Sequence, residues 1–206
     1  MPTLLHLDSS PLETSISREL TRTFVNTWKA AHPDGVVIER DVAAHPSKPV
    51  SASWVGANFT PEAARTAEQK QELAPSDQLI TELEKADEYV IGVAVHNFSI
   101  PSTLKLWIDQ VVRTGRTFAY GETGPQGLLQ GKKATILIAT GGVYDTGTPA
   151  AGFNFVEPYL KTILGFIGIT NIRFVTAGGV AQVLTGAINR ETFLKPTLEQ
   201  VRTFAA

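Results

Sequence analysis

Blocks of β-branched and apolar residues alternate with helix-like stretches along this chain, and this alternation constrains the fold more than any other feature. Turn residues bound each block, which is the pattern of βαβ units that feed a parallel sheet. Strands are expected at Thr3 to Asp8, Val36 to Asp41, Tyr89 to Val95, Ala134 to Thr140 and Ile172 to Ala177. The run from Val90 to Val95 is continuously apolar, as a strand covered on both faces should be. We therefore predict an α/β fold with that strand in the middle of the sheet.

Helical periodicity predicts the elements that cover this sheet. The first helix is the clearest, because Ile16, Leu20, Phe24 and Trp28 recur every four residues. Further helices are expected over Ala63 to Leu73, around Leu79 to Leu83, from Pro101 toward Gly115, from Phe155 to Ile167 and from Ile188 to Phe204. Pro75 should separate the first two of these. Residues 43–60, 120–131 and 141–152 are expected to be irregular, and long loops inside a compact domain are usually functional or disordered.

Composition limits the classes of function. A chain of 206 residues predicts one domain over residues 1–206. Its 18 Lys and Arg against 20 Asp and Glu give a net charge of −2, which argues against nucleic acid and against an anionic membrane surface as partners. Cysteine is absent and the histidines lack metal-ligand spacing, so no disulfide, metal site or cysteine nucleophile is expected.

The composition also bears on location and assembly. The chain has neither an apolar run of membrane-spanning length nor a secretory leader pattern, so a cytoplasmic protein is expected. Charged residues make up 18 %, which is below the usual share and favours a homo-oligomer with a buried interface.

A serine-rich loop, Asp8 to Ser17, joins the first predicted strand to the first helix. It is neither a Walker loop nor the glycine-rich dinucleotide fingerprint, because it lacks the glycines and the lysine. It does place four serine hydroxyls and free backbone N–H groups at the positive end of a helix, which suits a phosphate. The alternative is that Ser15 or Thr14 only caps the helix, and composition taken alone favours that reading.

Two further loops follow the third and fourth predicted strands, at His96 to Pro101 and Thr140 to Tyr144. The carboxyl ends of parallel strands border the crevice in which open α/β sheets bind ligands, so the three loops should converge. Gly141-Gly142 would permit close approach of a flat ligand, and the Asn97-Phe98 peptide could donate N–H groups to its edge. The alternatives are that Gly-Gly is a simple turn and that Phe98 is core. His96 could deliver a proton beside such a ligand, although local packing is the favoured interpretation.

A series of sequence blocks along the chain is more specific than any single motif. The blocks are Ser9-Ser10 with Ser15-Ile16-Ser17, His96 to Lys105, Gly115 to Tyr120, Gly124 to Leu128, Gly131 to Lys133, and Gly141-Gly142. In order and spacing they resemble the FMN-dependent NADH:quinone oxidoreductases known as azoreductases, over essentially the whole chain. The resemblance implies a flavodoxin-like fold with five parallel strands in the order 2-1-3-4-5, helices on both faces, and a homodimer with one FMN per subunit.

The resemblance also implies roles for individual residues. FMN would contact Ser10, Ser15, Ile16, Ser17, Val95, His96, Asn97, Phe98, Ala139, Thr140, Gly141 and Gly142. The substrate slot would include Phe59, Phe98, Phe118, Tyr120 and Phe153, some of them reaching across the dimer. No catalytic residue is assigned, because hydride transfer belongs to the FMN.

The chain departs from the family pattern at three places. Met-Tyr is common where this chain has Val95-His96, Arg is frequent at the position of Thr140, and His often stands where Tyr144 does. These differences bear on flavin potential, on substrate choice and on the preference between NADH and NADPH.

The expected function is oxidation of NADH or NADPH through FMN, with reduction of quinones to hydroquinones and of azo compounds to amines by a ping-pong mechanism. The alternatives are an FMN reductase or chromate-type reductase of the same fold, a flavodoxin-like electron carrier, and a non-catalytic nucleotide-binding module. Such carriers are strongly acidic, which a net charge of −2 does not match. Lys105, Arg113 and Arg116 could attract a nucleotide phosphate, but they are interpreted as a solvated face.

Overall fold

The main sheet has five parallel strands in the order β2-β1-β3-β6-β7, in a computed structural model that describes residues 1–206. The strands of the chain are β1 (Thr3–Asp8), β2 (Val36–Asp41), β3 (Glu88–Ala94), β4 (Phe118–Gly121), β5 (Gly124–Gly127), β6 (Lys133–Thr140) and β7 (Asn171–Gly178). The α-helices are α1 (Ile16–Ala31), α2 (Ala52–Phe59), α3 (Ala67–Lys85), α4 (Ser102–Val111), α5 (Val156–Phe166), α6 (Ala181–Leu184) and α7 (Arg190–Ala205). Numbered within the sheet, the strand order is 2-1-3-4-5, which confirms the predicted topology.

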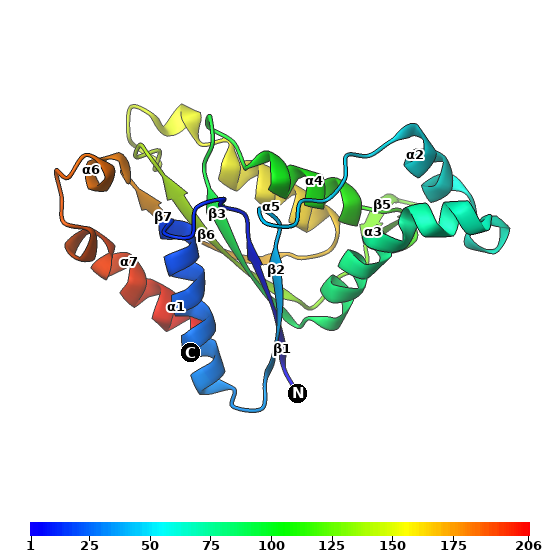
Figure 1. Ribbon diagram of the computed structural model, residues 1–206, viewed down its shortest axis with the longest axis horizontal. Helices are drawn as coiled ribbons and strands as arrows, with labels where there is room; N and C mark the ends of the chain where they lie inside the picture. The colour runs from blue at the N-terminus through cyan, green and yellow to red at the C-terminus, as the bar shows by residue number, and fades with distance from the viewer.

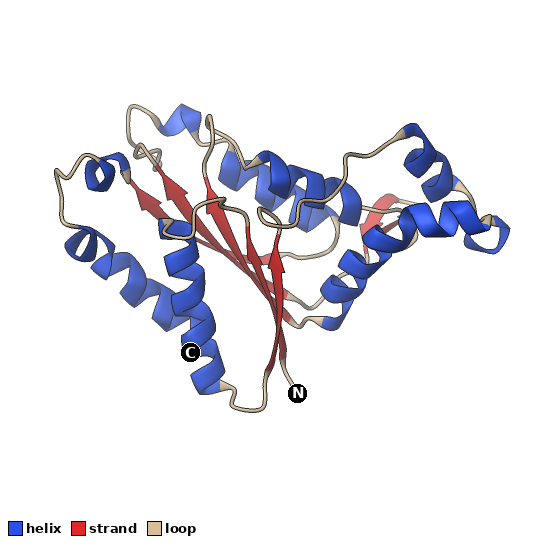
Figure 2. Cartoon of the chain, viewed as in Figure 1, coloured by secondary structure: helices blue, strands red, loops and turns tan.

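Helices cover both faces of this sheet, as Figures 1 and 2 show. Because successive strand residues face opposite sides, each strand contributes to two cores. Leu4 of β1 packs with α1 and α7, whereas Leu5 faces the core formed with α3, α4 and α5. The central strand β3 is buried along most of its length, which explains its unbroken apolar run. None of the helices is both long and apolar enough to cross a membrane.

The helix interrupted by Pro75 is the first correction to the sequence analysis. The structure has one helix, α3, with Pro75 inside it, and residues 62–64 form a separate 3₁₀ turn (Figure 1). A proline in a helix removes one backbone donor and one hydrogen bond. Leu73 before Pro75 and Leu79 and Leu83 after it are all buried, so tertiary packing holds both halves in a single helix.

Two segments expected to be irregular contain regular structure. Within residues 43–60 the short helix α2 is capped by the Ser51 hydroxyl, and Trp54 and Ala57 pack on Leu73. Residues 120–131 contain most of the β4–β5 hairpin, whose strands have four residues each. Both elements are too short to show a periodic sequence pattern. The helix α4 also ends at Val111, earlier than expected, and Gly115 lies in the following turn with a φ of +77°.

Candidate functional site

The loop between β1 and α1 presents donors at a helix N-terminus. The Ser15 hydroxyl accepts a hydrogen bond from the Arg18 N–H at 3.3 Å, so the predicted cap is confirmed. Ser9 and Ser10 are buried, and the Ser9 hydroxyl donates to the carbonyl of Gly92 at 2.7 Å. The N–H groups of Ile16 and Ser17 belong to the first turn, where a helix supplies no acceptors of its own. The loop therefore caps α1 and also keeps N–H groups free to bind an anion.

The turn after β3 is held in a conformation that costs energy. Asn97 has a φ of +48° and Phe98 a φ of +67°. His96 and Ser99 close the turn with two reciprocal backbone hydrogen bonds, each 3.0 Å long. Positive φ angles at residues with a Cβ cost about 1–2 kcal/mol each and concentrate at functional sites. Phe98 is 45 % exposed, so it is not a core residue.

The end of β6 carries a buried hydroxyl with no partner. Thr140 is 4 % exposed, and its Oγ1 makes no hydrogen bond within the protein. The neighbouring Gly141 is open, since a Cβ placed there would have no atom within 4 Å. Gly142 is covered by Tyr144, whose ring would lie 2.7 Å from such a Cβ. This strand end therefore offers a free donor beside backbone that a flat ligand can approach closely.

Three aromatic rings lie together over these strand ends. The ring centroid of Phe98 is 5.0 Å from that of Phe153 and 6.0 Å from that of Tyr144. They line a small pocket together with Val95, Thr140, Asp145 and Glu157, and the rings fill most of it, leaving a cavity of about 20 Å³. Phe98 and Phe153 were both predicted to line the substrate slot, and the structure brings them into contact. Tyr144 completes the cluster through long-range packing that no local sequence pattern predicts.

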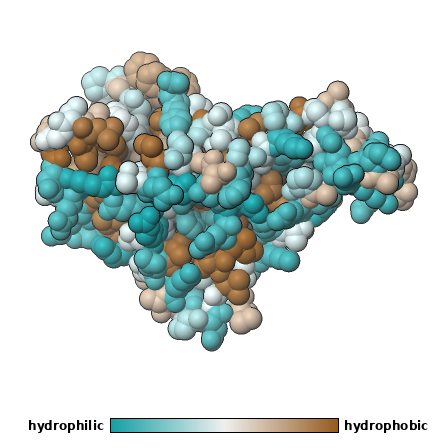
Figure 3. All heavy atoms as spheres, viewed as in Figure 1, coloured by the Kyte–Doolittle hydropathy of each residue, from teal (hydrophilic) through white to brown (hydrophobic).

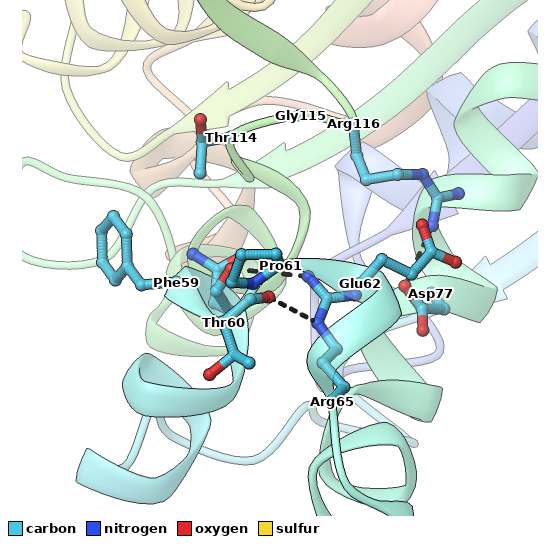
Figure 4. A pocket seen from close by; sticks show the side chains of 10 residues that line it. Phe59, Thr60, Pro61, Glu62, Arg65, Asp77, Thr114, Gly115 and Arg116 are labelled. Carbon is cyan, nitrogen blue, oxygen red and sulfur yellow. Dashed lines mark hydrogen bonds and ion pairs between the residues drawn. The ribbon is translucent and has the colours of Figure 1, made fainter.

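The other predicted slot residues lie elsewhere in the chain. Phe118 of β4 is buried against Phe166, with ring centroids 4.7 Å apart, and Tyr120 packs edge-on against it. Tyr120 and Phe59 are 73 % and 70 % exposed. Phe59, at the end of α2, borders a separate polar pocket with Arg65, Asp77 and Arg116 (Figure 4). Within one chain, these residues do not join the cluster of Phe98 and Phe153.

His96 is exposed and lines an open pocket with Lys105 and Tyr159. Burial raises the pKa of the Tyr159 phenol, although the nearby Lys105 ammonium opposes that shift. The pKa of Lys105 is itself raised, mainly by its hydrogen bond to Asp109. Lys105 is thus already paired, at an Nζ to Oδ1 distance of 2.5 Å.

Arg113 corrects the interpretation of a solvated basic face. It lies after the end of α4 and is 1 % exposed, with its guanidinium bound to Asp77, Ser76 and Asn58. Arg116 is more exposed and pairs with Asp77 and Glu84. The sequence shows two basic residues close together but not the carboxylates from α3 that bind them. Both arginines are therefore paired with carboxylates of α3, and neither forms a free basic face.

Comparison with known proteins identifies the family to which this chain belongs. A model of the flavodoxin-like fold matches residues 2–202. The FMN-dependent NADH:quinone oxidoreductase of Acidobacterium capsulatum is 66 % identical over 206 residues, which is 100 % of both chains. The chain belongs to the FMN-dependent NADH:quinone oxidoreductase family. A second member, FMN-dependent NADH:quinone oxidoreductase 3 of Burkholderia lata, is 47 % identical over 204 residues, covering 98 % of this chain and 99 % of its own.

A solved structure agrees with the family assignment. The crystal structure of an azoreductase from Bacillus anthracis superposes with a TM-score of 0.88 at 30 % identity, covering 100 % of this chain and 99 % of that one. Family membership and the flavodoxin-like fold, both expected from the sequence, are confirmed. The roles of the individual site residues remain predictions.

Proposed function

We propose that this protein is an FMN-dependent NAD(P)H oxidoreductase that reduces quinones to hydroquinones and azo compounds to amines. One observation carries the proposal: a hydroxyl-rich helix N-terminus, a strained turn and a free buried donor stand at the carboxyl ends of neighbouring strands. That is the edge of an open α/β sheet at which ligands bind. The names of the A. capsulatum and B. lata relatives and of the B. anthracis structure support the same activity.

The residues present suit FMN in chemistry. Ser10, Ser15, Ile16 and Ser17 supply hydroxyl and N–H donors for a phosphate without a cationic side chain. The Thr140 hydroxyl, buried and unpartnered, suits an acceptor at the edge of the ring system. Val95, His96, Asn97, Phe98, Ala139, Gly141 and Gly142 would complete the surroundings of the rings.

When bound, FMN supplies hydride acceptance and donation at N5. The tasks of this chain are then to hold the cofactor, to orient the substrate among Phe98, Tyr144 and Phe153, and to limit water there. If one slot serves both substrates, NAD(P)⁺ must leave before the acceptor binds, so ping-pong kinetics are expected. An azo bond takes two such rounds to reach two amines, whereas a quinone takes one.

We further propose a homodimer. Large apolar side chains remain exposed in this chain, and on the face shown in Figure 3 hydrophobic residues gather in patches among hydrophilic ones. Phe59 and Tyr120 are among these exposed side chains and lie apart from Phe98 and Phe153, so a partner subunit could bring them to the slot. Exposed apolar patches of this kind often mark an interface. Light scattering coupled to gel filtration tests the assembly, and a monomer at micromolar concentration would contradict it.

The decisive experiment is the visible spectrum of the purified protein with FMN, before and after anaerobic addition of NADH or NADPH. Bleaching of the flavin band at about 450 nm, reversed by a quinone, is the expected result. Bound flavin that neither nucleotide reduces would indicate an electron carrier. Loss of flavin during turnover would indicate an FMN reductase, and failure to bind flavin would contradict the proposal.

A further inference from the structure

The side chain of Arg18 folds back from the first turn of α1 over the serine-rich loop. Its Nε and Nη2 both donate to the carbonyl oxygen of Ser10, at 3.0 and 2.7 Å. Its guanidinium also binds Asp8 through Nη1 at 3.3 Å and Asp41 through Nη2 at 2.6 Å. One residue therefore joins the loop to the ends of β1 and β2.

The surroundings of Arg18 are fixed by the sheet. Asp8 and Asp41 are the last residues of β1 and β2 and lie opposite each other in the parallel register. Asp8 also accepts a hydrogen bond from the Thr21 hydroxyl at 2.8 Å, and Asp41 accepts from the N–H groups of Ala43 and Ala44. The side chain of Arg18 is only 14 % exposed. We call this arrangement of Arg18 with Ser10, Asp8 and Asp41 the clamp of Arg18. Hydrogen bonds from several directions hold it in place.

The pKa of Asp41 agrees with this geometry. Burial alone would raise the pKa of its carboxyl, but hydrogen bonds from the Ala44 N–H and from Arg18 outweigh burial and place the pKa below its ordinary value. Asp41 is therefore an anion at neutral pH. With two carboxylates bound to one guanidinium, the charge of Arg18 is already compensated.

The hydrogen bonds from Arg18 to the Ser10 carbonyl are important because Pro11 follows Ser10. Pro11 has no N–H, so the Ser10–Pro11 peptide can offer only its carbonyl acceptor. A carbonyl facing a phosphate would repel it, whereas one held by a guanidinium is directed elsewhere. Because the peptide unit is planar, two donors on that oxygen fix the orientation of the whole unit. The Ser9 hydroxyl is already bound to the Gly92 carbonyl, so the Ser10 hydroxyl and the N–H groups of Ile16 and Ser17 are the donors of the loop that remain for an anion.

We propose that Arg18 is a positioning residue for the cofactor phosphate, acting through the Ser10 carbonyl and not by direct charge attraction. This inference rests on the proposed function, since it takes FMN as the ligand of the loop. It assigns to Arg18, Asp8 and Asp41 a role in discriminating phosphorylated flavin from flavin without a phosphate.

The test compares FMN with riboflavin, which lacks the phosphate, by fluorescence titration of the apoprotein. In Arg18→Gln the Kd of FMN should rise about ten- to a hundredfold, the effect of losing charge-assisted hydrogen bonds, while the Kd of riboflavin stays as in the wild type. Arg18→Lys keeps the charge but lacks the planar fork, so it should not restore FMN binding. Arg22→Gln makes the same charge change at an exposed position of α1 and is the matched control.

Circular dichroism establishes that each variant is folded. If Arg18→Gln does not fold, Arg18→Lys and Asp41→Asn are used for the test. Asp41→Asn should raise the Kd of FMN without raising the Kd of riboflavin. An unchanged FMN Kd in Arg18→Gln, an equal loss for both flavins, or full rescue by lysine would overturn the inference. A wild-type protein that binds neither flavin would overturn the proposed function as well, which separates the two failures.

Discussion

Asp77 and Arg113 form an ion pair of unequal burial, with Oδ1 and Nη1 2.8 Å apart. The guanidinium side chain is 1 % exposed and the carboxylate side chain 39 %. Arg113 also binds Asn58 and Ser76, so it ties the last turn of α2 to α3 and to the end of α4. Burial lowers the pKa of Arg113 while Asp77 opposes that shift, and the guanidinium remains charged.

This inequality predicts the order of three variants. Asp77→Ala leaves a buried guanidinium without its carboxylate and should lower the free energy of unfolding by about 3 kcal/mol. Arg113→Met should cost less, because Asp77 keeps Arg116 and is partly solvated. Glu84→Gln, which removes an exposed partner of Arg116, should cost under about 1 kcal/mol. Urea unfolding at neutral pH measures all three, and a larger loss in Arg113→Met than in Asp77→Ala would contradict this account.

Gly92 in the central strand allows Asp8 and Thr21 to meet. A Cβ at residue 92 would lie 2.8 Å from Asp8 Oδ1 and 2.8 Å from Thr21 Cγ2. Gly92→Ala should therefore destabilise the protein by about 1–3 kcal/mol through overpacking and should weaken FMN binding by displacing Asp8. In Gly56→Ala the new methyl group meets nothing within 4 Å on helix α2, so that variant should be neutral or up to about 1 kcal/mol more stable. Thermal unfolding of the two apoproteins checks the opposite signs.

The unpartnered hydroxyl of Thr140 predicts opposite effects on the apoprotein and the complex. Thr140→Val keeps the shape and removes a buried group without a partner, so the apoprotein should gain up to about 1–2 kcal/mol. If the hydroxyl binds the flavin, the Kd of both FMN and riboflavin should rise about tenfold. Calorimetry of the apoprotein and flavin titration measure the two effects. Unchanged flavin binding would show that the Thr140 hydroxyl does not contact the flavin.

The positive φ of Phe98 predicts that its two truncations differ. Phe98→Ala and Phe98→Gly both remove the ring that packs on Phe153, but only glycine adopts a φ of +67° without strain. The glycine variant should be more stable than the alanine variant by about 1–2 kcal/mol. Both should lose activity toward aromatic acceptors. Equal unfolding midpoints in denaturant would show that the turn relaxes.

The burial of Tyr89 predicts that the protein loses stability at high pH. Burial raises the pKa of its phenol above the usual value, with smaller contributions from Asp87 and Glu84, and its hydroxyl donates to the Leu83 carbonyl at 2.8 Å. Because the folded pKa exceeds the unfolded value of about 10, this contribution is complete below that pH and is lost as the pH rises above it. Tyr89→Phe should cost about 1 kcal/mol at pH 7 and should make the alkaline decline less steep. Urea unfolding across this pH range measures the difference, with the exposed Tyr120→Phe as control.

Local sequence patterns predicted the elements whose signals are local. The bounds of β1 and β2 match the structure, α1 follows from its four-residue period, and Ser15 caps it as its position suggested. The family resemblance came from blocks of adjacent residues, which a single sequence displays in full. Backbone propensity, amphipathic periodicity and capping all act over a few residues, so they can be read without coordinates.

Contacts between distant segments were decided by the tertiary structure alone. Pro75 remains inside α3 because buried side chains on both sides of it pack together, and Arg113 is buried because α3 supplies its carboxylate. The clamp of Arg18 depends on the register that sets Asp8 opposite Asp41. The cluster of Phe98, Tyr144 and Phe153 depends on strand ends brought together by the sheet. Each of these results from packing and charge pairing between residues far apart in the chain, which local periodicity does not encode.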